Sequence, residues 1–258
     1  MTAHPKVTLV TCKSMPNLFK GEEGLLDELA ARGCDPQIKV WNDPDVDWSE
    51  AGMVVVRSVS DYASDRPAFL EWTKQLRRVQ NSADVLNWNT DKHYLKELAA
   101  LGMPTIPTNW LEPEQNLSKH QIHTRFPAFG EFVVKPAVSS GVRDIGRYTT
   151  VDTRQRQAAM RQVQGLLGEG RSVMIQRYVE EIDLHGEISL VFFNGLVSHA
   201  VEKRSALHPA SVSDPAVHEA VVTAEAADSV AWKWGEEIRR VLHGYVRSRL
   251  GHDEQFLF

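Results

Sequence analysis

A lysine at the end of an apolar segment is the first feature of this sequence that could do chemistry. Phe132-Val-Val-Lys135-Pro136 places a positive charge beside buried backbone, and Ala137–Val142 follows with two serines and a glycine. A lysine here can also pack its stem while its ammonium reaches water, and that alternative stays open. A loop of small residues can surround phosphate oxygens with backbone N–H groups and hydroxyls. Lysine and loop together predict a phosphate-binding site.

Two further segments carry polar residues where a helix begins or a strand ends. Asn87–Lys92 lies at the start of an expected helix, so helix capping alone explains its polar residues and Lys92 is equally consistent with a solvated surface lysine. Met174–Val179 predicts a strand that acidic residues follow at 180–183. A strand end with solvated carboxylates explains this third segment equally well.

The elements that must position these residues begin with an open α/β domain over residues 1–88. Short apolar segments with many β-branched residues predict strands at Val7–Cys12, Gln37–Trp41 and Met53–Arg57, with a helix at Gly24–Arg32. Continuous rather than alternating apolar character is typical of a parallel sheet that is covered on both faces. The remaining expected elements are a helix at Pro67–Val79 and one more strand at Asp84–Trp88.

The rest of the chain predicts two α+β subdomains, at residues 89–175 and 176–258. The first contains expected helices at Lys92–Leu101 and Thr153–Leu167 and expected strands at Glu131–Pro136 and Arg171–Tyr178. In the second, Asn194-Gly195 predicts a two-residue hairpin turn, because this pair accommodates positive φ angles. Its other expected elements are the hairpin strands Glu187–Phe193 and Leu196–Lys203, a loop at 205–224, a helix at Ala227–Leu250 and the start of a strand at Gln255–Phe258.

Composition and motifs exclude several classes of protein. The 258 residues carry 29 Lys and Arg against 34 Asp and Glu, a net charge of −5 that does not suit a dedicated nucleic-acid binder. No apolar run approaches the ~20 residues of a membrane span, and the N-terminus has no secretory signal, so we expect a cytoplasmic protein. The chain contains no Walker A loop and no Gly-x-Gly-x-x-Gly after the first strand.

The segments Asn87–Thr108, Val133–Gly141 and Met174–Val201, in this order and spacing, resemble the ATP-grasp superfamily. They are similar to its carboxylate–amine ligase branch, with glutathione synthetase and the ribosomal-protein glutamate ligases. VVVRSVSDY at 54–62 and GEISLVFFNGLVSHAVEKR at 186–204 are similar to the group that contains the O-ureido-serine cyclo-ligase of cycloserine biosynthesis. The resemblance implies an α/β protein with the ATP-grasp fold, in which an N-terminal open parallel-sheet domain precedes two α+β subdomains that sandwich ATP.

The resemblance also implies roles for individual residues. The phosphates of ATP would be held by Lys92 and Lys135 and covered by a flexible lid of Ser139, Ser140 and Gly141. The adenine edge would meet Gln176 and the backbone of Tyr178 and Val179, and the ribose hydroxyls would meet Glu187 or, as second choice, Asp183. Arg204 would face the γ-phosphate, which makes Arg204 and Lys135 the expected catalytic residues.

Three residues are expected to bind the second substrate. Arg57 and Ser58 follow an apolar strand at the carboxyl edge of the parallel sheet, where open α/β sheets bind ligands. Arg57 is expected to clamp a substrate carboxylate, with a plain surface arginine as the alternative. Arg143 and Arg147 flank the lid, and we assign Arg143 to the substrate.

The expected cofactors are ATP and Mg²⁺, and no residue is assigned as a metal ligand. In the family these ligands follow the long C-terminal helix, where this sequence ends at Phe258, so we expect a truncated chain. The expected function is activation of a small amino-acid-like carboxylate as an acyl phosphate, which an amine or internal nucleophile attacks. The alternatives are a nucleotide-binding protein or fragment without ligase activity and a ligase that modifies a protein tail. Substrate identity and assembly into a homo-oligomer stay open.

Overall fold

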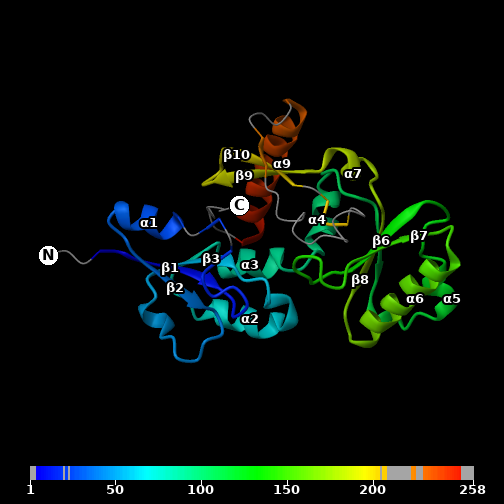
Figure 1. Ribbon diagram of the computed structural model, residues 1–258, viewed down its shortest axis with the longest axis horizontal. Helices are drawn as coiled ribbons and strands as arrows, with labels where there is room; N and C mark the ends of the chain where they lie inside the picture. Colours follow the sequence, from blue (N-terminus) through cyan, green and yellow to red (C-terminus); the bar gives the residue numbers. More distant parts are fainter. Residues whose placement is uncertain are drawn as a thin grey trace. The chain divides into compact units, whose positions relative to one another are not determined.

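The computed structural model describes residues 4–19, 21–22, 24–203, 205–207, 222–224 and 229–250. The chain forms two compact units, the first within Met1–Thr90 and the second within Asp91–Ser248 (Figure 1). Among the residues described, no helix combines the length and the apolar character that crossing a membrane requires.

The first unit is built on a four-stranded, all-parallel sheet in the order β2-β1-β3-β4. Its strands are β1 (Lys6–Thr11), β2 (Asp35–Val40), β3 (Met53–Ser58) and β4 (Val79–Gln80). The central strand β1 is buried over its last four residues, as expected for a strand covered on both faces. The open parallel sheet predicted for this part of the chain is confirmed.

Aromatic side chains fill much of the core of the first unit. Trp41 meets Phe69 edge-on with ring centroids 5.6 Å apart, and Trp48 meets Trp72 in the same way at 5.0 Å. Edge-to-face pairs of this kind each add about 0.5–1.5 kcal/mol beyond their burial. The helices of this unit are α1 (Gly24–Ala31), α2 (Arg66–Lys74), α3 (Ala83–Asn89) and two short 3₁₀ turns at Trp48–Glu50 and Tyr62–Ser64.

The strand predicted at Asp84–Trp88 is wrong, because these residues belong to helix α3. A short apolar run does not by itself distinguish a buried strand from a buried helix turn. Here Ser82 decides the outcome, since its Oγ accepts a hydrogen bond from the Val85 N–H at 3.3 Å and caps the helix. The helix predicted at Pro67–Val79 is likewise too long, because α2 ends at Lys74 and β4 begins at Val79.

The second unit contains an antiparallel sheet in the order β5-β8-β6-β7. Its strands are β5 (Thr108–Leu111), β6 (Glu131–Pro136), β7 (Gly146–Thr149) and β8 (Val173–Arg177), and its helices are α4 (Tyr94–Ala100), α5 (Lys119–His123) and α6 (Thr153–Gly168), with a 3₁₀ turn at Pro113–Gln115. The expected strands at 131–136 and 171–178 and the expected helix at 153–167 are confirmed. The sequence did not predict β5 and α5.

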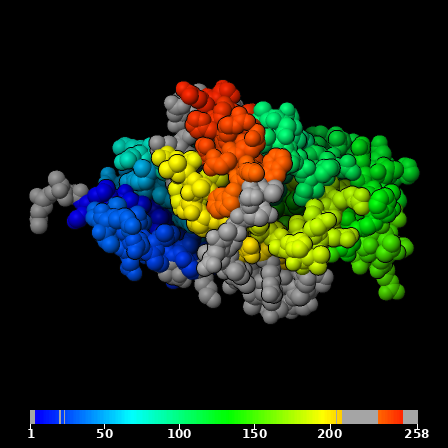
Figure 2. Space-filling model, turned by 90° about the horizontal axis from the view of Figure 1, so that it is seen from above, coloured from blue at the N-terminus to red at the C-terminus, as the bar shows by residue number. Residues whose placement is uncertain are grey.

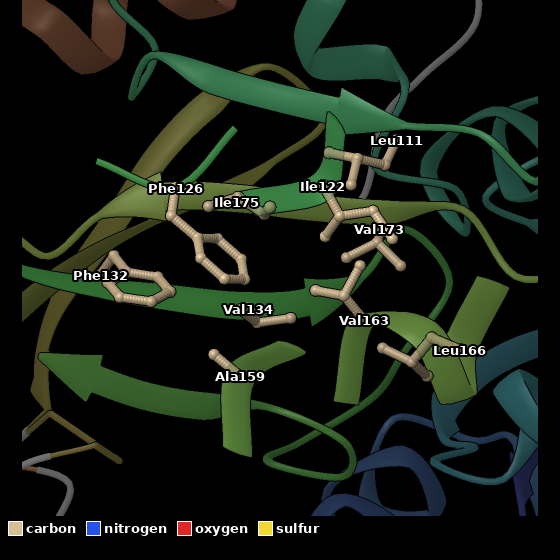
Figure 3. Close-up of a cluster of buried hydrophobic side chains, with 10 residues drawn as sticks. All are labelled: Leu111, Ile122, Phe126, Phe132, Val134, Ala159, Val163, Leu166, Val173 and Ile175. Carbon is tan, nitrogen blue, oxygen red and sulfur yellow. The ribbon is translucent and has the colours of Figure 1, made fainter. Parts of the chain in front are cut away.

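Helices α5 and α6 cover one face of this sheet and form its apolar core with it (Figure 3). Strand side chains point from the sheet toward Val163 and Leu166 of α6 and Ile122 of α5. Phe132, Val134, Val173 and Leu111 are each fully buried there. This dry layer fixes which side of each strand faces the core, and therefore which side remains for polar residues.

The second unit also contains a three-stranded antiparallel sheet in the order β11-β10-β9. Its strands are β9 (Glu187–Phe193), β10 (Leu196–Lys203) and β11 (Val222–Ala224), flanked by α7 (Glu181–His185) and α9 (Ser229–Leu250). Helix α9 packs so tightly on β9 that a Cβ added to Gly235 would lie 2.3 Å from Leu190 Cδ1, and Figure 2 shows the helix directly beside the hairpin.

The predicted hairpin is confirmed, and its turn has positive φ at both central residues, 52° at Asn194 and 73° at Gly195. The expected loop at 205–224 ends in β11, which pairs with β10. Residues 208–221 of that loop and the expected strand at Gln255–Phe258 lie outside the described residues.

The cap on α3 gives a direct test of the corrected assignment. Ser82→Ala should lower the free energy of unfolding by about 0.5–2 kcal/mol, because the Val85 N–H loses its acceptor. Chemical denaturation followed by fluorescence of the clustered tryptophans would measure the change. Ser82→Asp, which keeps an acceptor, should remain close to the wild type. Equal destabilisation by both substitutions would contradict the cap.

Candidate functional site

Strand alternation sorts the side chains of the β5-β8-β6-β7 sheet onto two faces. The core face holds Phe132, Val134, Val173 and Ile175. Alternate residues point to opposite faces, so the other face carries Val133, Lys135, Met174 and Gln176, extended by Thr108 of β5 and Arg147 of β7 through strand pairing. We call this second face the site face. It brings a lysine, an arginine and an amide to one side of a sheet whose other side is dry.

Lys135 lies on the site face directly across from Met174. Burial lowers the pKa of its ammonium group, while the Glu187 carboxylate opposes that shift. Lys135 is half-buried, so its ammonium group is only partly exposed to water. Lys135 and Glu187, two residues predicted to bind the same ligand, are brought within electrostatic reach of each other.

Lys92 fastens the start of the α4 region to the loop that follows β6. Its Nζ donates to the Ser139 carbonyl at 3.0 Å and to the Ser139 hydroxyl at 2.8 Å, and its backbone N–H donates to the Ala137 carbonyl at 3.0 Å. Burial, followed by the positive charge of Lys135, lowers the pKa of Lys92 to about 8, while Asp91 acts in the opposite direction. Two cations therefore lie close together with incomplete solvation.

Such a pair favours an anionic ligand. Each lysine makes the charged state of its neighbour less favourable, and a phosphate placed between them would reverse that effect for both. Charge-assisted hydrogen bonds to phosphate are also stronger than bonds between neutral groups. Lys92 and Lys135, predicted separately from the sequence, form one cationic site with the loop after β6.

The segment that carries Lys92 is held by a stacked histidine. The His93 ring stacks on Trp110 with centroids 4.5 Å apart, and its two nitrogens contact Asp91 at 2.6 Å and Glu112 at 3.1 Å. Burial would raise the pKa of Glu112, but hydrogen bonds with Ser172, His93 and Lys96 lower it to about 2. Glu112 is therefore a permanent negative anchor for this segment, and the sequence analysis did not single it out.

The small-residue loop after β6 has a buried base and an exposed tip. Ser139 is 7% exposed and is bound by Lys92, so it belongs to the base. Residues 141–144 are exposed, and Gly141 has a φ of +62°. Ser140 lies between the two parts and is half-buried, and Arg143 lies in the exposed tip. Asp144, at the end of the tip, forms an ion pair with Arg171 at 2.8 Å, and its carbonyl accepts from Gln162 at 2.6 Å. The exposed part of the predicted lid is therefore its Gly141 end.

Gln176 is buried on the site face, where its Nε2 donates to Thr108 Oγ1 at 2.7 Å. That bond orients the amide across two adjacent strands. The Tyr178 N–H donates to the Glu131 carbonyl at 2.9 Å. The Tyr178 N–H, one of the predicted adenine contacts, is therefore already bonded to the protein backbone. The Gln176 side chain and Val179 are the other predicted adenine contacts.

Asp183, the second choice for the ribose, is engaged by two other side chains. It accepts a hydrogen bond from the Tyr178 hydroxyl, and its other carboxylate oxygen pairs with Arg147 at 2.8 Å. These contacts leave Glu187 as the better candidate for the ribose. Arg147, expected beside the lid, contacts Tyr178 and Asp183, which follow β8.

Arg57 and Ser58 both contact Glu22 in the first unit. Arg57 forms an ion pair with Glu22, and the Ser58 hydroxyl donates to the other oxygen of the same carboxylate. The Ser58 Oγ also accepts from the Phe19 N–H at 2.8 Å. Arg57 and Ser58, which were predicted to bind a substrate carboxylate, therefore bind the carboxylate of Glu22 in this structure.

Arg204, the predicted γ-phosphate contact, lies outside the described residues. Within the described ranges, no three His, Cys, Asp or Glu side chains are grouped as a metal site would require. Cys12, at the end of β1, is buried against the hydroxyls of Ser14 and Ser60.

Comparison with known proteins extends these observations over almost the whole chain. Residues 7–87 match the family described as D-cycloserine synthetase DcsG, N-terminal domain. The cycloserine biosynthesis protein DcsG of Streptomyces lavendulae is 35% identical over 190 residues. A crystal structure of D-cycloserine synthetase DcsG is 28% identical, superposes with a TM-score of 0.79, and covers 97% of this chain and 84% of its own.

A RimK domain ATP-grasp protein from Sphaerobacter thermophilus shares the fold at 14% identity, with a TM-score of 0.56 and coverage of 93% of this chain and 99% of its own. The chain has the fold of ATP-grasp proteins and is similar over most of its length to D-cycloserine synthetase DcsG. The segments on which the sequence resemblance rested, with the two lysines, the loop after β6 and the end of β8, all belong to the second unit. The match to the Streptomyces protein covers 72% of this chain and 62% of that relative's length.

The lowered pKa of Lys92 predicts how binding of ATP to this ATP-grasp protein varies with pH. Above about pH 8 the free protein loses the Lys92 proton, so binding must take up a proton and affinity falls by up to about tenfold per pH unit. The phosphates are fully ionised in this range and contribute no such change. Calorimetric titration with ATP from about pH 7 to about pH 9.5 would measure it.

Lys92→Arg is the matched control, because a guanidinium stays charged throughout this range. Its affinity for ATP should depend less on pH than that of the wild type. A wild-type profile as flat as that of the arginine variant would show that Lys92 does not face the phosphates.

Proposed function

We propose that this protein is an ATP-dependent ligase that activates the carboxylate of a small amino-acid-like molecule as an acyl phosphate. The observation that carries the proposal is the pair of incompletely solvated cations, Lys92 and Lys135, beside the loop after β6. Relatives whose names describe D-cycloserine synthesis support a biosynthetic ligase, and they favour a reaction that closes a ring.

In the first step, a carboxylate oxygen of the substrate attacks the γ-phosphorus of ATP, the bond to the β–γ bridging oxygen breaks, and ADP leaves. There is little covalent chemistry for the protein to perform, so catalysis depends on position and on charge neutralisation. Lys92 and Lys135 would hold the phosphates, and Lys92 would exchange its bonds to Ser139 for bonds to phosphate oxygen. The exposed tip around Gly141 would close over them and exclude water.

In the second step, a nucleophile attacks the acyl carbon and inorganic phosphate leaves. An amine of the same molecule would give a cyclic product, and an amine of a second molecule would give a linear one. The nucleophile loses a proton in either case, and the departing phosphate is basic enough to accept it. Glu187 would bind the ribose hydroxyls and Gln176 with Val179 the adenine, because carboxylates and amides pair with these groups.

The substrate carboxylate would enter the Arg57–Ser58 clamp in exchange for Glu22. The side chain of Arg57 is 41% exposed and accessible to a substrate, whereas that of Glu22 is 17% exposed and also bound by Ser58, so the exchange must release both contacts. Arg143, in the exposed tip, keeps its proposed role in substrate binding on the sequence argument alone. We place the reaction in the cytoplasm, where ATP is available. A homo-oligomer has no part in this proposal.

Mg²⁺ enters the proposal as the ion that accompanies ATP and neutralises part of its charge. The described residues do not offer a grouped set of acidic ligands for it, and no step is assigned to it here. Arg204 keeps its proposed place at the γ-phosphate on the sequence argument alone.

The cationic site can be tested at Lys135. Lys135→Ala should weaken ATP binding by about tenfold to a hundredfold, because one charge-assisted contact is worth roughly 1.5–3 kcal/mol. Lys135→Arg, which retains the charge, should lose less. Fluorescence titration with a labelled ATP analogue, with circular dichroism to check folding, would measure both. Unchanged affinity in a folded alanine variant would remove Lys135 from the site.

The activity itself calls for a screen of ADP release against amino acids and ureido-amino acids, with O-ureido-serine first. Release that depends on one of these compounds, with loss of the free carboxylate, is the expected result. ATP binding with no ADP release for any of them would instead favour the alternative, a nucleotide-binding protein without ligase activity.

A further inference from the structure

We propose that Arg147 is a positioning residue of this ligase, which fixes segment 205–207 against the end of β8 and so sets the position of the chain directly after Arg204. The inference rests on the proposed function, because it concerns the geometry of that site. Arg147 lies on β7, on the site face opposite Val133.

One guanidinium group joins three separate parts of the second unit. It pairs with Glu131 of β6, with a 3.0 Å bond from Nε, and with Asp183 of α7 at 2.8 Å. It also donates to the Leu207 carbonyl at 3.1 Å. The planar fork of arginine can serve several acceptors at once, which a lysine ammonium does only in a less fixed arrangement.

Tyr178 connects the same parts a second time. The Arg147 guanidinium lies over the Tyr178 ring, 3.7 Å from its centroid. The Tyr178 hydroxyl donates to Asp183 and lies 3.1 Å from Ser205 Oγ, which in turn accepts from the Leu207 N–H at 3.2 Å. Segment 205–207 is therefore held at a side chain and at both backbone groups of Leu207.

Burial makes these contacts specific. Arg147 and Asp183 side chains are only 16% and 19% exposed, and Ser205 is 4% exposed. A guanidinium group so far removed from water needs its two carboxylates, and each carboxylate needs the guanidinium. The network cannot slide as a surface ion pair does, so it locks the residues it joins.

The Arg147 network contacts two segments that lie next to different parts of the proposed site. At one end, Tyr178 precedes Val179, which is proposed to bind adenine. At the other, segment 205–207 follows Arg204, which is proposed to face the γ-phosphate. Loss of Arg147 should therefore disturb the placement of the transferring phosphate more than the affinity for ATP.

The variants are Arg147→Met, which keeps the stem, and Arg147→Lys, which keeps the charge without the planar fork. In both variants, we expect kcat for ADP release to fall by about tenfold to a hundredfold, because a reacting group misplaced by about 1 Å reacts that much more slowly. The dissociation constant for ATP should stay within about threefold of the wild-type value. Thermal unfolding should separate the two variants, because only the methionine variant removes the positive charge beside Glu131 and Asp183. Arg239→Lys, at an ion pair with Glu236 on α9, is the matched control and should retain wild-type kcat.

A double-mutant cycle on kcat joins Arg147→Met to Ser205→Ala. If both act by holding segment 205–207, the double variant loses little more than the stronger single variant. Additive losses, or a kcat that follows only the folded fraction of each variant, would overturn the inference.

Amide hydrogen exchange of the peptide that spans 205–207 decides the point without any turnover. The Leu207 N–H should exchange faster in both Arg147 variants than in wild type and the Arg239→Lys control. Unchanged exchange would refute the positioning role. A wild-type chain that releases no ADP, but shows this change in exchange, would refute the proposed ligase function while supporting the role of Arg147 in holding the segment.

Discussion

The ammonium groups of Lys92 and Lys135 lie near each other in the second unit and are only partly solvated. The rest of the site depends on how the repulsion between these two charges is compensated. Lys92 comes from the segment before α4 and Lys135 from the end of β6, so their proximity depends on the fold between them. Each lowers the stability of the other's charge, which makes the empty site electrostatically unfavourable. The bonds from Lys92 to Ser139 relieve part of that cost and tie the loop after β6 to the helix that follows Lys92. An anion relieves the remainder, so the electrostatics of the free protein already favour a phosphate-bearing ligand.

Much of this arrangement could be predicted from the order of residue types along the chain. An apolar run that ends in Lys135 predicts a strand with a positive charge at its end. Asn194-Gly195 predicts a two-residue hairpin turn. The strand order β2-β1-β3-β4 likewise agrees with continuous apolar segments. Such local signals are strong because one residue's backbone preference decides them.

The partners of charged residues could not be predicted in the same way. Arg57 and Arg147 were both singled out as cations near an expected ligand, and both are paired with carboxylates of the protein itself. Glu22 is far from Arg57 in sequence, and Leu207 is far from Arg147, so no local pattern reports either contact. The strand predicted at 84–88 was wrong for a related reason. The hydroxyl of Ser82, which caps the helix, lies outside the apolar run from which the strand was predicted. Sequence identifies which charges are available, and tertiary structure determines which of them are already satisfied.

The two-faced β5-β8-β6-β7 sheet also limits how this protein can diverge. Moving the register of β6 by one residue would send Lys135 into the layer beneath α6 and turn Phe132 and Val134 toward the ligand. A single-codon insertion or deletion inside β6 or β8 would therefore disturb the site and the core at once, whereas a substitution on the site face changes only the contacts of that one side chain. Changes of length are therefore tolerated more easily between these strands than within them. The strands themselves should keep a constant length over long evolutionary times, even where their individual residues are replaced.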